Sequence, residues 1–335
     1  MSKSGVPAGY RDRLGIYETQ TAIGDIHRIF EGALARALNL KRVSAPLFVN
    51  PKTGLNDDLN GIERPVEFGI KETGTVAQVV QSLAKWKRMA LYKYQFSQGE
   101  GLYTDMNAIR RDEEMDNLHS IYVDQWDWEK IVPEGRRNLS YLKEEVTAII
   151  SAICDTADDI KKSFPATEVE LSREISFITT QELEDLYPSF TPKEREHAYV
   201  REHHTTFLMQ IGWPLRSGSR HDGRAPDYDD WSLNGDILFW HETLGIAMEI
   251  SSMGIRVNSE ILDAQLKKAN CDDRRKLAYH SMLLEGALPQ TIGGGIGQSR
   301  LCMLLLGKAH IGEVQVSLWD DETQKTCKEL GVTLL

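Results

Sequence analysis

Two stretches of the chain repeat apolar residues at the spacing of an amphipathic helix. An apolar side chain recurs every three or four positions from Ile23 to Leu38, which predicts a helix of about five turns that begins near Thr21. Asn39 is the expected end of this helix. The same spacing over residues 141–164 predicts a second long helix.

Residues 101–110 and 118–128 carry the clearest extended pattern. Successive side chains of a strand point to opposite faces, and in the second segment Gln125 and Asp127 share a face. The acidic turn 112–114 lies between the two segments, so we expect an antiparallel hairpin. One of its faces would carry Arg110, Glu113, Gln125 and Asp127, a set that suits a polar ligand better than a core.

Short strands dominate the rest of the pattern. Residues 212–233 are expected to form a long active-site loop, because a connection of this length is seldom without a role and its aromatic residues argue against disorder. We expect further strands at 43–49 (interrupted by Pro46), 66–70, 75–80, 175–179, 207–211, 236–240, 246–251 and 314–319, and shorter helices at 81–88, 181–187, 192–204, 259–270 and 272–285.

Strand follows strand more often than helix, so the sequence predicts an α+β fold with a mainly antiparallel sheet flanked by helices. No boundary rich in Pro, Gly or Ser divides the chain. We therefore expect a flexible N-terminal arm over residues 1–16 and a single catalytic domain over residues 17–335.

Four glycines lie within residues 293–297 and precede Gln298-Ser299-Arg300 and an apolar run. The segment lacks the Gly-Lys-Ser/Thr of a P-loop, and no register of its glycines gives the dinucleotide motif GxGxxG. It predicts a strand-turn-helix in which the backbone approaches a ligand and the first helical turn attracts an anion. A turn that merely leads into a buried helix is the alternative.

Two further groups of charged residues have both a functional and a structural interpretation. Asp236 and Glu249 lie on adjacent predicted strands and could share a divalent cation, or could be an ordinary surface pair. Lys85 and Lys87 form a basic face of the 81–88 helix, which is either solvent-exposed or part of a site.

Composition narrows the class of protein. The 335 residues carry a net charge of −11, which disfavours binding along a nucleic acid. No apolar run approaches the ~20 residues of a membrane span. The four cysteines lie far apart without a CxxC pair, so we expect free thiols and a cytoplasmic location. Arg110 and Arg300 as phosphate ligands and the two acids as Mg²⁺ ligands fit an enzyme that activates a carboxylate with a nucleotide.

Six longer motifs carry a resemblance to a known family. They are residues 82–88 (SLAKWKR), 99–103 (GEGLY), 119–129 (HSIYVDQWDWE), 224–231 (RAPDYDDW), 249–257 (EISSMGIRV) and 289–300 (PQTIGGGIGQSR). From about Ile23 to the C-terminus the chain closely resembles the ammonia-dependent asparagine synthetases, or aspartate–ammonia ligases. The resemblance implies a catalytic core like that of the class II aminoacyl-tRNA synthetases.

The resemblance also implies a reaction. The β-carboxylate of L-aspartate would attack MgATP to give β-aspartyl-AMP and pyrophosphate, and ammonia would then displace AMP to give asparagine. ATP is thus an expected co-substrate and Mg²⁺ an expected cofactor. A homodimer is expected through the 21–38 helix and the strand with Pro46, without nucleic-acid or membrane partners.

The matching motifs imply site residues. The catalytic residues would be Asp57, Arg110 and Gln125, and the metal ligands Asp236 and Glu249. The nucleotide would contact Arg110, Glu113, His119, Ser120, Ile237, Gly295, Gly297 and Arg300. The amino acid would contact Ser82, Lys87, Asp127, Asp229, Ser251, Ser252 and Arg256. Charge logic assigns Lys87 and Arg256 to its carboxylate and Asp127 and Asp229 to its ammonium group.

Two departures from the family pattern bear on these assignments. The segment between Trp231 and Leu233 is shorter than in the bacterial pattern, which could alter closure of the site. The segment GLNDDLNG leaves open whether Asp57 or Asp58 is the catalytic acid. An aminoacyl-tRNA synthetase-like adenylate-forming enzyme and a non-catalytic amino-acid-binding paralogue are the alternative functions.

Overall fold

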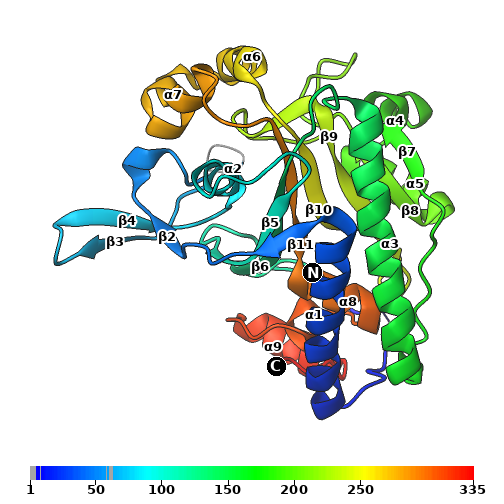
Figure 1. The fold of residues 1–335 in the computed structure, drawn as a ribbon. Coiled ribbons are helices and arrows are strands. Elements are labelled where there is room, and N and C mark those ends of the chain that lie inside the picture. Colours follow the sequence, from blue (N-terminus) through cyan, green and yellow to red (C-terminus); the bar gives the residue numbers. More distant parts are fainter. Residues whose placement is uncertain (1–4, 8, 58, 60–62) are drawn as a thin grey trace.

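An eight-stranded sheet forms the centre of the computed structural model, which describes residues 5–7, 9–57, 59 and 63–335 (Figure 1). Its strands, in spatial order, are β1 (Leu40–Arg42), β5 (Gly101–Ile109), β6 (Tyr122–Ile131), β11 (Thr291–Gly297), β10 (Ile246–Arg256), β9 (Asp229–His241), β8 (Thr205–Met209) and β7 (Ser176–Thr179). The pairs β1–β5 and β7–β8 are parallel, and the other neighbouring pairs are antiparallel. The predicted α+β fold with a mainly antiparallel sheet is confirmed.

Helices α1 (Ile16–Leu38) and α3 (Leu139–Ser163) lie side by side against one face of this sheet (Figure 1). Phe30 of α1 packs on Trp126 of β6 with ring centroids 4.9 Å apart. Helix α1 begins five residues before the predicted Thr21, because the carboxylate of Glu18 accepts a hydrogen bond from the backbone N–H of Gly15 and caps the first turn. Helix α8 (Gln298–Leu306) packs into the same core.

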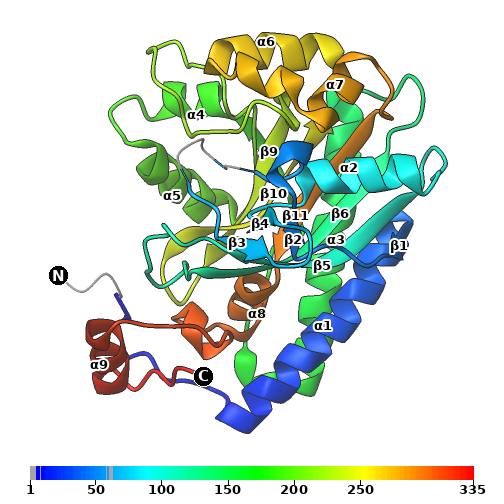
Figure 2. The ribbon, with the colours of Figure 1, turned by 90° about the vertical axis from the view of Figure 1, so that its left-hand side faces the viewer.

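The opposite face is covered by shorter helices. Leu183 of α4 (Thr180–Leu186) and Val200 of α5 (Pro192–His203) pack on Leu208 and Leu238. The remaining helices are α2 (Ala84–Lys93), α6 (Ser259–Ala269), α7 (Ala278–Leu284) and α9 (Asp321–Glu329), with short 3₁₀ helices at Pro51–Thr53, Pro165–Thr167, Asp272–Lys276 and Ile311–Glu313. Figure 2 shows α6 and α7 at the end of the molecule away from α9 and the C-terminus.

A separate three-stranded sheet projects from the side of the body (Figure 1). It consists of β2 (Phe48–Val49), β4 (Thr75–Val79) and β3 (Glu67–Ile70). The strand predicted over residues 43–49 is shorter, because Pro46 offers no backbone N–H and pairing starts only after it.

The predicted hairpin of β5 and β6 is confirmed, with a register that runs from Gly101 opposite Lys130 to Ile109 opposite Tyr122. Several predicted boundaries are wrong. Helix α2 covers 84–93 instead of 81–88, and the predicted 272–285 helix divides into a 3₁₀ turn and α7. Strand β6 begins at residue 122 instead of 118, β9 begins at residue 229 instead of 236, and β10 extends to residue 256 instead of 251.

The strand predicted at 314–319 is wrong. Within the described residues this segment pairs with no strand. Burial does not follow the apolar alternation of this segment: Val314 and Gln315 are buried, whereas Val316 and Leu318 point outward. Trp319 then packs edge-on against His310.

The N-terminal segment contacts the body at several described positions, of which Tyr10 and Asp12 are two. The Tyr10 hydroxyl donates to Glu313 Oε1 at 2.8 Å, and Lys308 Nζ donates to Asp12 Oδ1 at 2.5 Å. The division into a flexible arm and one domain stays a prediction. Among the described residues, no helix combines the length and apolarity needed to cross a membrane.

Candidate active site

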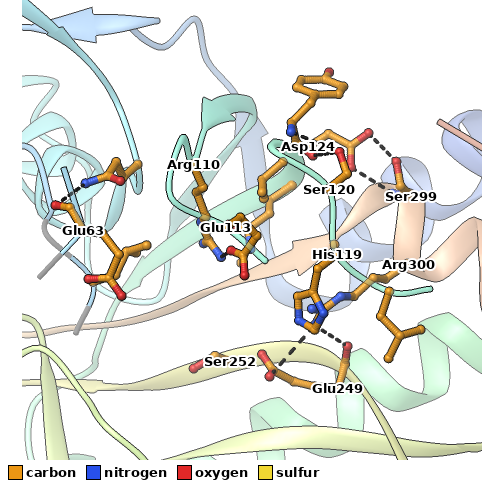
Figure 3. A pocket seen from close by; sticks show the side chains of 18 of the residues that line it. Glu63, Arg110, Glu113, His119, Ser120, Asp124, Glu249, Ser252, Ser299 and Arg300 are labelled. Atoms are coloured by element: carbon orange, nitrogen blue, oxygen red, sulfur yellow. Dashed lines mark hydrogen bonds and ion pairs between the residues drawn. The ribbon is translucent and has the colours of Figure 1, made fainter. Parts of the chain in front are cut away.

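A cavity of about 340 Å³ lies where β6, β11 and β10 run side by side (Figure 3). Its polar lining comes from the ends of the β5–β6 hairpin, from β10, from β11 and from the first turn of α8. The structure brings together there the following predicted site residues: Arg110, Glu113, His119, Ser120, Gln125, Glu249, Ser252, Gly295, Gly297 and Arg300. The predicted nucleotide contacts of the hairpin and of the glycine-rich segment thus share one cavity, although the two segments lie far apart in the sequence.

Two arginines stand at different parts of this cavity. Arg110 Nη1 lies 3.9 Å from Glu113 Oε2, and its Nε is buried without a hydrogen-bond acceptor among the described residues. Arg300 Nη1 donates to the Glu249 carbonyl at 3.1 Å and lies 3.9 Å from Glu249 Oε2. Figure 3 shows His119 close to Arg300 and Glu249, and Arg110 with Glu113 apart from them. Two guanidinium groups at separate places suit a ligand with several phosphates.

The glycines of 293–297 do not form the predicted turn; they lie in β11 itself, between β6 and β10, and α8 follows at once. A Cβ on Gly295 would lie 2.5 Å from Gln125 Oε1, and a Cβ on Gly293 would lie 2.7 Å from Arg256 Nη2. The glycines therefore leave space for polar side chains of the neighbouring strands. Strand geometry explains this, because alternate residues of β11 face the site.

Asp124 was not predicted as a site residue, yet it lines the cavity and caps α8. Its Oδ1 accepts from the Ser299 backbone N–H at 3.0 Å, and its Oδ2 accepts from the Ser299 hydroxyl at 2.6 Å. The first turn of α8 thus already holds an anion of the protein itself. Glu63, Tyr228 and Gln315 also line the cavity and were missed, because no motif or periodicity marked them.

A buried cluster of alternating charges lies beneath the cavity. Lys87 Nζ forms an ion pair with Asp127 and donates to the Gly294 carbonyl at 2.8 Å. Lys87 and Lys85 are 0% and 3% exposed, so the solvent-exposed alternative is wrong for both. Burial lowers the pKa of Lys87, although Asp127 acts to raise it.

Arg256 is the second cation of this cluster. It forms ion pairs with Asp229 and with Glu129, whose Oε2 lies 2.7 Å from Arg256 Nη2. Burial raises the pKa of Asp229 more than Arg256 lowers it. Glu129 also accepts from the Thr291 hydroxyl at 2.7 Å, so it fixes Arg256 in place, a role that the sequence did not suggest.

Two atoms of the predicted amino-acid pocket are buried without a hydrogen-bond partner among the described residues: Asp127 Oδ2 and Ser251 Oγ. Such atoms cost folding free energy, of the order of 1–3 kcal/mol each, unless a ligand or water satisfies them. A bulge of β10 between Glu249 and Ser251 alters the strand alternation at this point. Ser82, by contrast, accepts a hydrogen bond from Ala84 N–H at the start of α2 and does not line the main cavity.

The two predicted metal ligands lie on adjacent strands, as expected. Arg224 forms an ion pair with Asp236, and Asp236 Oδ1 has no hydrogen-bond partner in the described part of the chain. Burial and, more weakly, Glu249 raise the pKa of Asp236 to about 7, although Arg224 opposes the rise. Burial acts against ionisation of Glu249 too, but Arg300 and Arg224 lower its pKa overall.

Asp57 and Ile237 do not line the main cavity, whereas the predicted 212–233 loop contributes Asp222, Gly223, Arg224, Ala225 and Tyr228 to it. Asp57 lines a second, smaller cavity, and its alternative Asp58 lies outside the described residues. The Ile237 side chain is buried in the α1–α3 core, so only its backbone could meet a nucleotide. The predicted 212–233 loop is shorter than expected, because β9 already begins at Asp229 and continues through the segment after Trp231.

The sequence profile of aspartate-ammonia ligase matches residues 17–331. The chain belongs to the aspartate–ammonia ligase family. It is 59% identical to the aspartate–ammonia ligase of Clostridium tetani (strain Massachusetts / E88) over 331 residues, which cover 98% of this chain and 97% of that relative. The aspartate–ammonia ligase of Clostridium perfringens (strain 13 / Type A) is 57% identical over 336 residues, with both chains fully covered.

Solved structures place the fold of this aspartate–ammonia ligase family member among the class II aminoacyl-tRNA synthetase catalytic cores. The Entamoeba histolytica asparaginyl-tRNA synthetase in complex with asparaginyl-adenylate superposes with a TM-score of 0.66 at 12% identity, over 90% of this chain and 66% of that chain. The Pyrococcus horikoshii asparaginyl-tRNA synthetase complexed with asparaginyl-adenylate gives 0.64 at 16% identity, over 96% and 77%. The chain thus spans about two thirds to three quarters of these synthetases.

Proposed function

We propose that this chain makes asparagine from L-aspartate and ammonia, with ATP converted to AMP and pyrophosphate through β-aspartyl-AMP. The observation that carries the proposal is its 59% identity, over nearly the whole chain, to a relative named aspartate–ammonia ligase. The cavity supports it, because cations suited to phosphates and a cluster suited to an amino acid adjoin at β6 and β11.

In this proposal the nucleotide occupies the main cavity. Arg110 neutralises charge on the α-phosphate, Glu113 lies at the adenine, and Arg300 holds the distal phosphates. The unpaired Nε of Arg110, within the described part of the chain, supports a role in binding an anion that the protein itself does not supply. Fixed cations at a phosphorus under attack are the main source of rate in such transfers.

Asp236 and Glu249 are proposed to hold Mg²⁺. The donors fit, since Mg²⁺ prefers carboxylate oxygens, and Asp236 offers a buried oxygen without a partner among the described residues. When bound, the ion supplies charge neutralisation at the phosphates. The ion pair with Arg224 would keep the Asp236 carboxylate oriented.

The buried cluster is proposed to bind the α-amino and α-carboxylate groups of aspartate. Lys87 and Arg256 would meet the carboxylate, and Asp127 and Asp229 the ammonium group. Without ligand these four residues pair with one another, so aspartate would exchange these ion pairs for contacts with its own charges. The free oxygen of Asp127, among the described residues, marks a place for one such contact. Gln125 and Asp57 would lie at the reacting β-carboxyl end.

A homodimer and a cytoplasmic location complete the proposal. The projecting sheet exposes Leu47, Phe48, Phe68 and Val76 to between 39% and 52%, and apolar side chains grouped at an edge are typical of a subunit interface. Sedimentation should give twice the chain mass, and a monomer at micromolar concentration would contradict this part.

Exchange of pyrophosphate into ATP, dependent on aspartate, tests adenylate formation. Arg110→Ala should reduce this exchange by about 100-fold or more, as expected for loss of a cation at the reacting phosphate. Its matched control is Arg111→Ala, which removes the neighbouring, exposed arginine and should leave exchange within about twofold. Equal effects of both substitutions would remove Arg110 from the mechanism.

A further inference from the structure

The second cavity, of about 170 Å³, lies on the other side of the segment that carries Asp57. Gln81 lines the main cavity, and its Nε2 donates to the Asp57 carbonyl at 2.9 Å. Asp57 itself lines the second cavity, so the two cavities lie next to one another at this segment. The second cavity is lined by Pro51, Gly54, Asn56, Asp57, Pro65, Gln78, Lys85, Arg274, Leu277 and His280.

His280 is a fully buried histidine in this lining, and Asp227 orients it. The imidazole Nε2 lies 2.8 Å from Asp227 Oδ2. Burial opposes ionisation of Asp227, but Lys85, His280 and Arg274 together hold its pKa well below the usual range. An ionised carboxylate only accepts hydrogen bonds, so Nε2 carries a hydrogen and Nδ1 is the ring nitrogen that can accept one.

The other ring nitrogen belongs to a side chain that lines the cavity. His280 Nδ1 is buried and has no hydrogen-bond partner among the described residues. A Cβ on Gly54 would lie 3.1 Å from this nitrogen and 2.8 Å from Leu277 Cβ, so a side chain at position 54 would crowd the imidazole. Since an unsatisfied buried acceptor costs about 1–3 kcal/mol, the site favours a small hydrogen-bond donor.

The charges around His280 suit a donor that is small and cationic or neutral. Lys85 Nζ and Arg274 Nη1 lie 3.1 and 2.9 Å from Asp227 Oδ2, so both cations are already paired with a carboxylate. Asp57 adds a second carboxylate to the cavity, and the Tyr279 ring packs edge-on to the imidazole at 5.4 Å. The formal charges of Lys85, Arg274, Asp227 and Asp57 cancel, which removes the attraction for an anion.

We infer that this cavity admits ammonium and that His280 Nδ1 takes its proton before the nitrogen attacks. The inference rests on the proposed function, since it supplies the nucleophile for the second step. Ammonium gives one proton to Nδ1, and the lone pair that this frees forms the C–N bond with the β-carbonyl carbon. The C–O bond to AMP breaks with its electron pair on the phosphate oxygen, and the amide nitrogen releases a second proton to solvent. The proton on His280 returns to solvent through the cavity.

The test is the dependence of asparagine formation on total ammonium at several pH values. Below the pKa of ammonium the fraction of free ammonia rises about tenfold per pH unit. If the enzyme has an internal base for ammonium, kcat/KM for total ammonium should rise less steeply than the fraction of free ammonia between about pH 6.5 and about pH 8.5. His280→Gln keeps a donor for Asp227 but lacks the base, so its kcat/KM should fall at least about tenfold at pH 7 and follow free ammonia.

Adenylate formation separates this inference from the proposed function. Aspartate-dependent pyrophosphate exchange by His280→Gln should stay within about twofold of the unaltered protein, and His204→Gln, at an exposed histidine, should change neither reaction. If His280→Gln shows normal pyrophosphate exchange and the same pH dependence of kcat/KM for ammonium as the unaltered protein, the inference is overturned and the proposed function is not. Absence of exchange in the unaltered protein would overturn the proposed function.

A second variant decides the case in which His280→Gln does not fold. Gln78→Trp narrows the cavity from strand β4, where an aromatic residue is tolerated. It should raise the KM for ammonium at least about fivefold and leave exchange intact. An unchanged KM for ammonium would show that ammonium does not pass through this cavity.

Discussion

Replacing Asp236 by Asn should stabilise the metal-free protein. The carboxylate is 6% exposed, and burial and the charge of Glu249 raise its pKa from 3.8 to about 7, against the attraction of Arg224. The folded state therefore binds more protons than the unfolded state between these two pH values. The free energy of unfolding then falls as pH rises through that window and is lowest above pH 7.

The size of the effect follows from the same rise in pKa. At about 1.4 kcal/mol for each pKa unit, the rise from 3.8 to about 7 corresponds to at most about 4 kcal/mol. Asn is neutral at every pH and can still accept from Arg224. We expect Asp236→Asn to gain about 1–4 kcal/mol at pH 8 and close to nothing at pH 4.

Urea unfolding in the presence of a chelator, at pH 4, 6 and 8, measures this gain. Asp222→Asn is the control, because Asp222 pairs with the same Arg224 at 2.8 Å but is 49% exposed; it should change stability by less than about 0.5 kcal/mol. Added Mg²⁺ should stabilise the unaltered protein at pH 8 and not Asp236→Asn. A loss of stability in Asp236→Asn at pH 8 would refute the reasoning, since attraction to Arg224 would then outweigh burial.

Two further predictions concern the buried cluster. Glu129→Gln removes one of the two buried carboxylates that pair with Arg256, so the free energy of unfolding should fall by about 3–5 kcal/mol. If urea unfolding shows a loss below about 1 kcal/mol, the Glu129–Arg256 pair does not contribute to stability. Ser251→Ala removes a hydroxyl that has no partner among the described residues, so stability should change by less than about 1 kcal/mol, while the KM for aspartate rises about tenfold; an unchanged KM would place Ser251 outside the pocket.

Periodicity sufficed for the parts of the fold that depend on local sequence. The α1 and α3 helices, the β5–β6 hairpin and the strands β3 and β4 all follow patterns within one or two elements, whereas their assembly with β2 into a separate sheet was not predicted. The assignment of 314–319 failed because the apolar alternation there does not match burial: Val316 and Leu318 are exposed, Gln315 is buried, and no strand of the described residues pairs with the segment. The glycines of β11 were read as a turn for a related reason, since glycine allows turns but is also required where side chains of neighbouring strands need space.

The sequence also did not show which charged side chains are buried in the folded protein. Lys87 pairs with Asp127 from 40 residues away, and Lys85 pairs with Asp227 from 142 residues away. Neither helical spacing nor composition shows that residues so far apart in the sequence form an ion pair. The pattern around the two lysines is therefore the same as that of a solvent-exposed helix face. The motifs shared with the family predicted Lys87 and Asp127 as contacts of the amino acid, which stays a prediction, whereas Asp227 and His280 became candidates only once the fold placed them together.

Quantifying the products made from L-aspartate, MgATP and ammonium tests the central claim most directly. Asparagine, AMP and pyrophosphate should appear in equal amounts, at the same rate with and without added tRNA. Pyrophosphate exchange without asparagine, or aspartate transferred to tRNA, would contradict the claim and assign the adenylate to another acceptor.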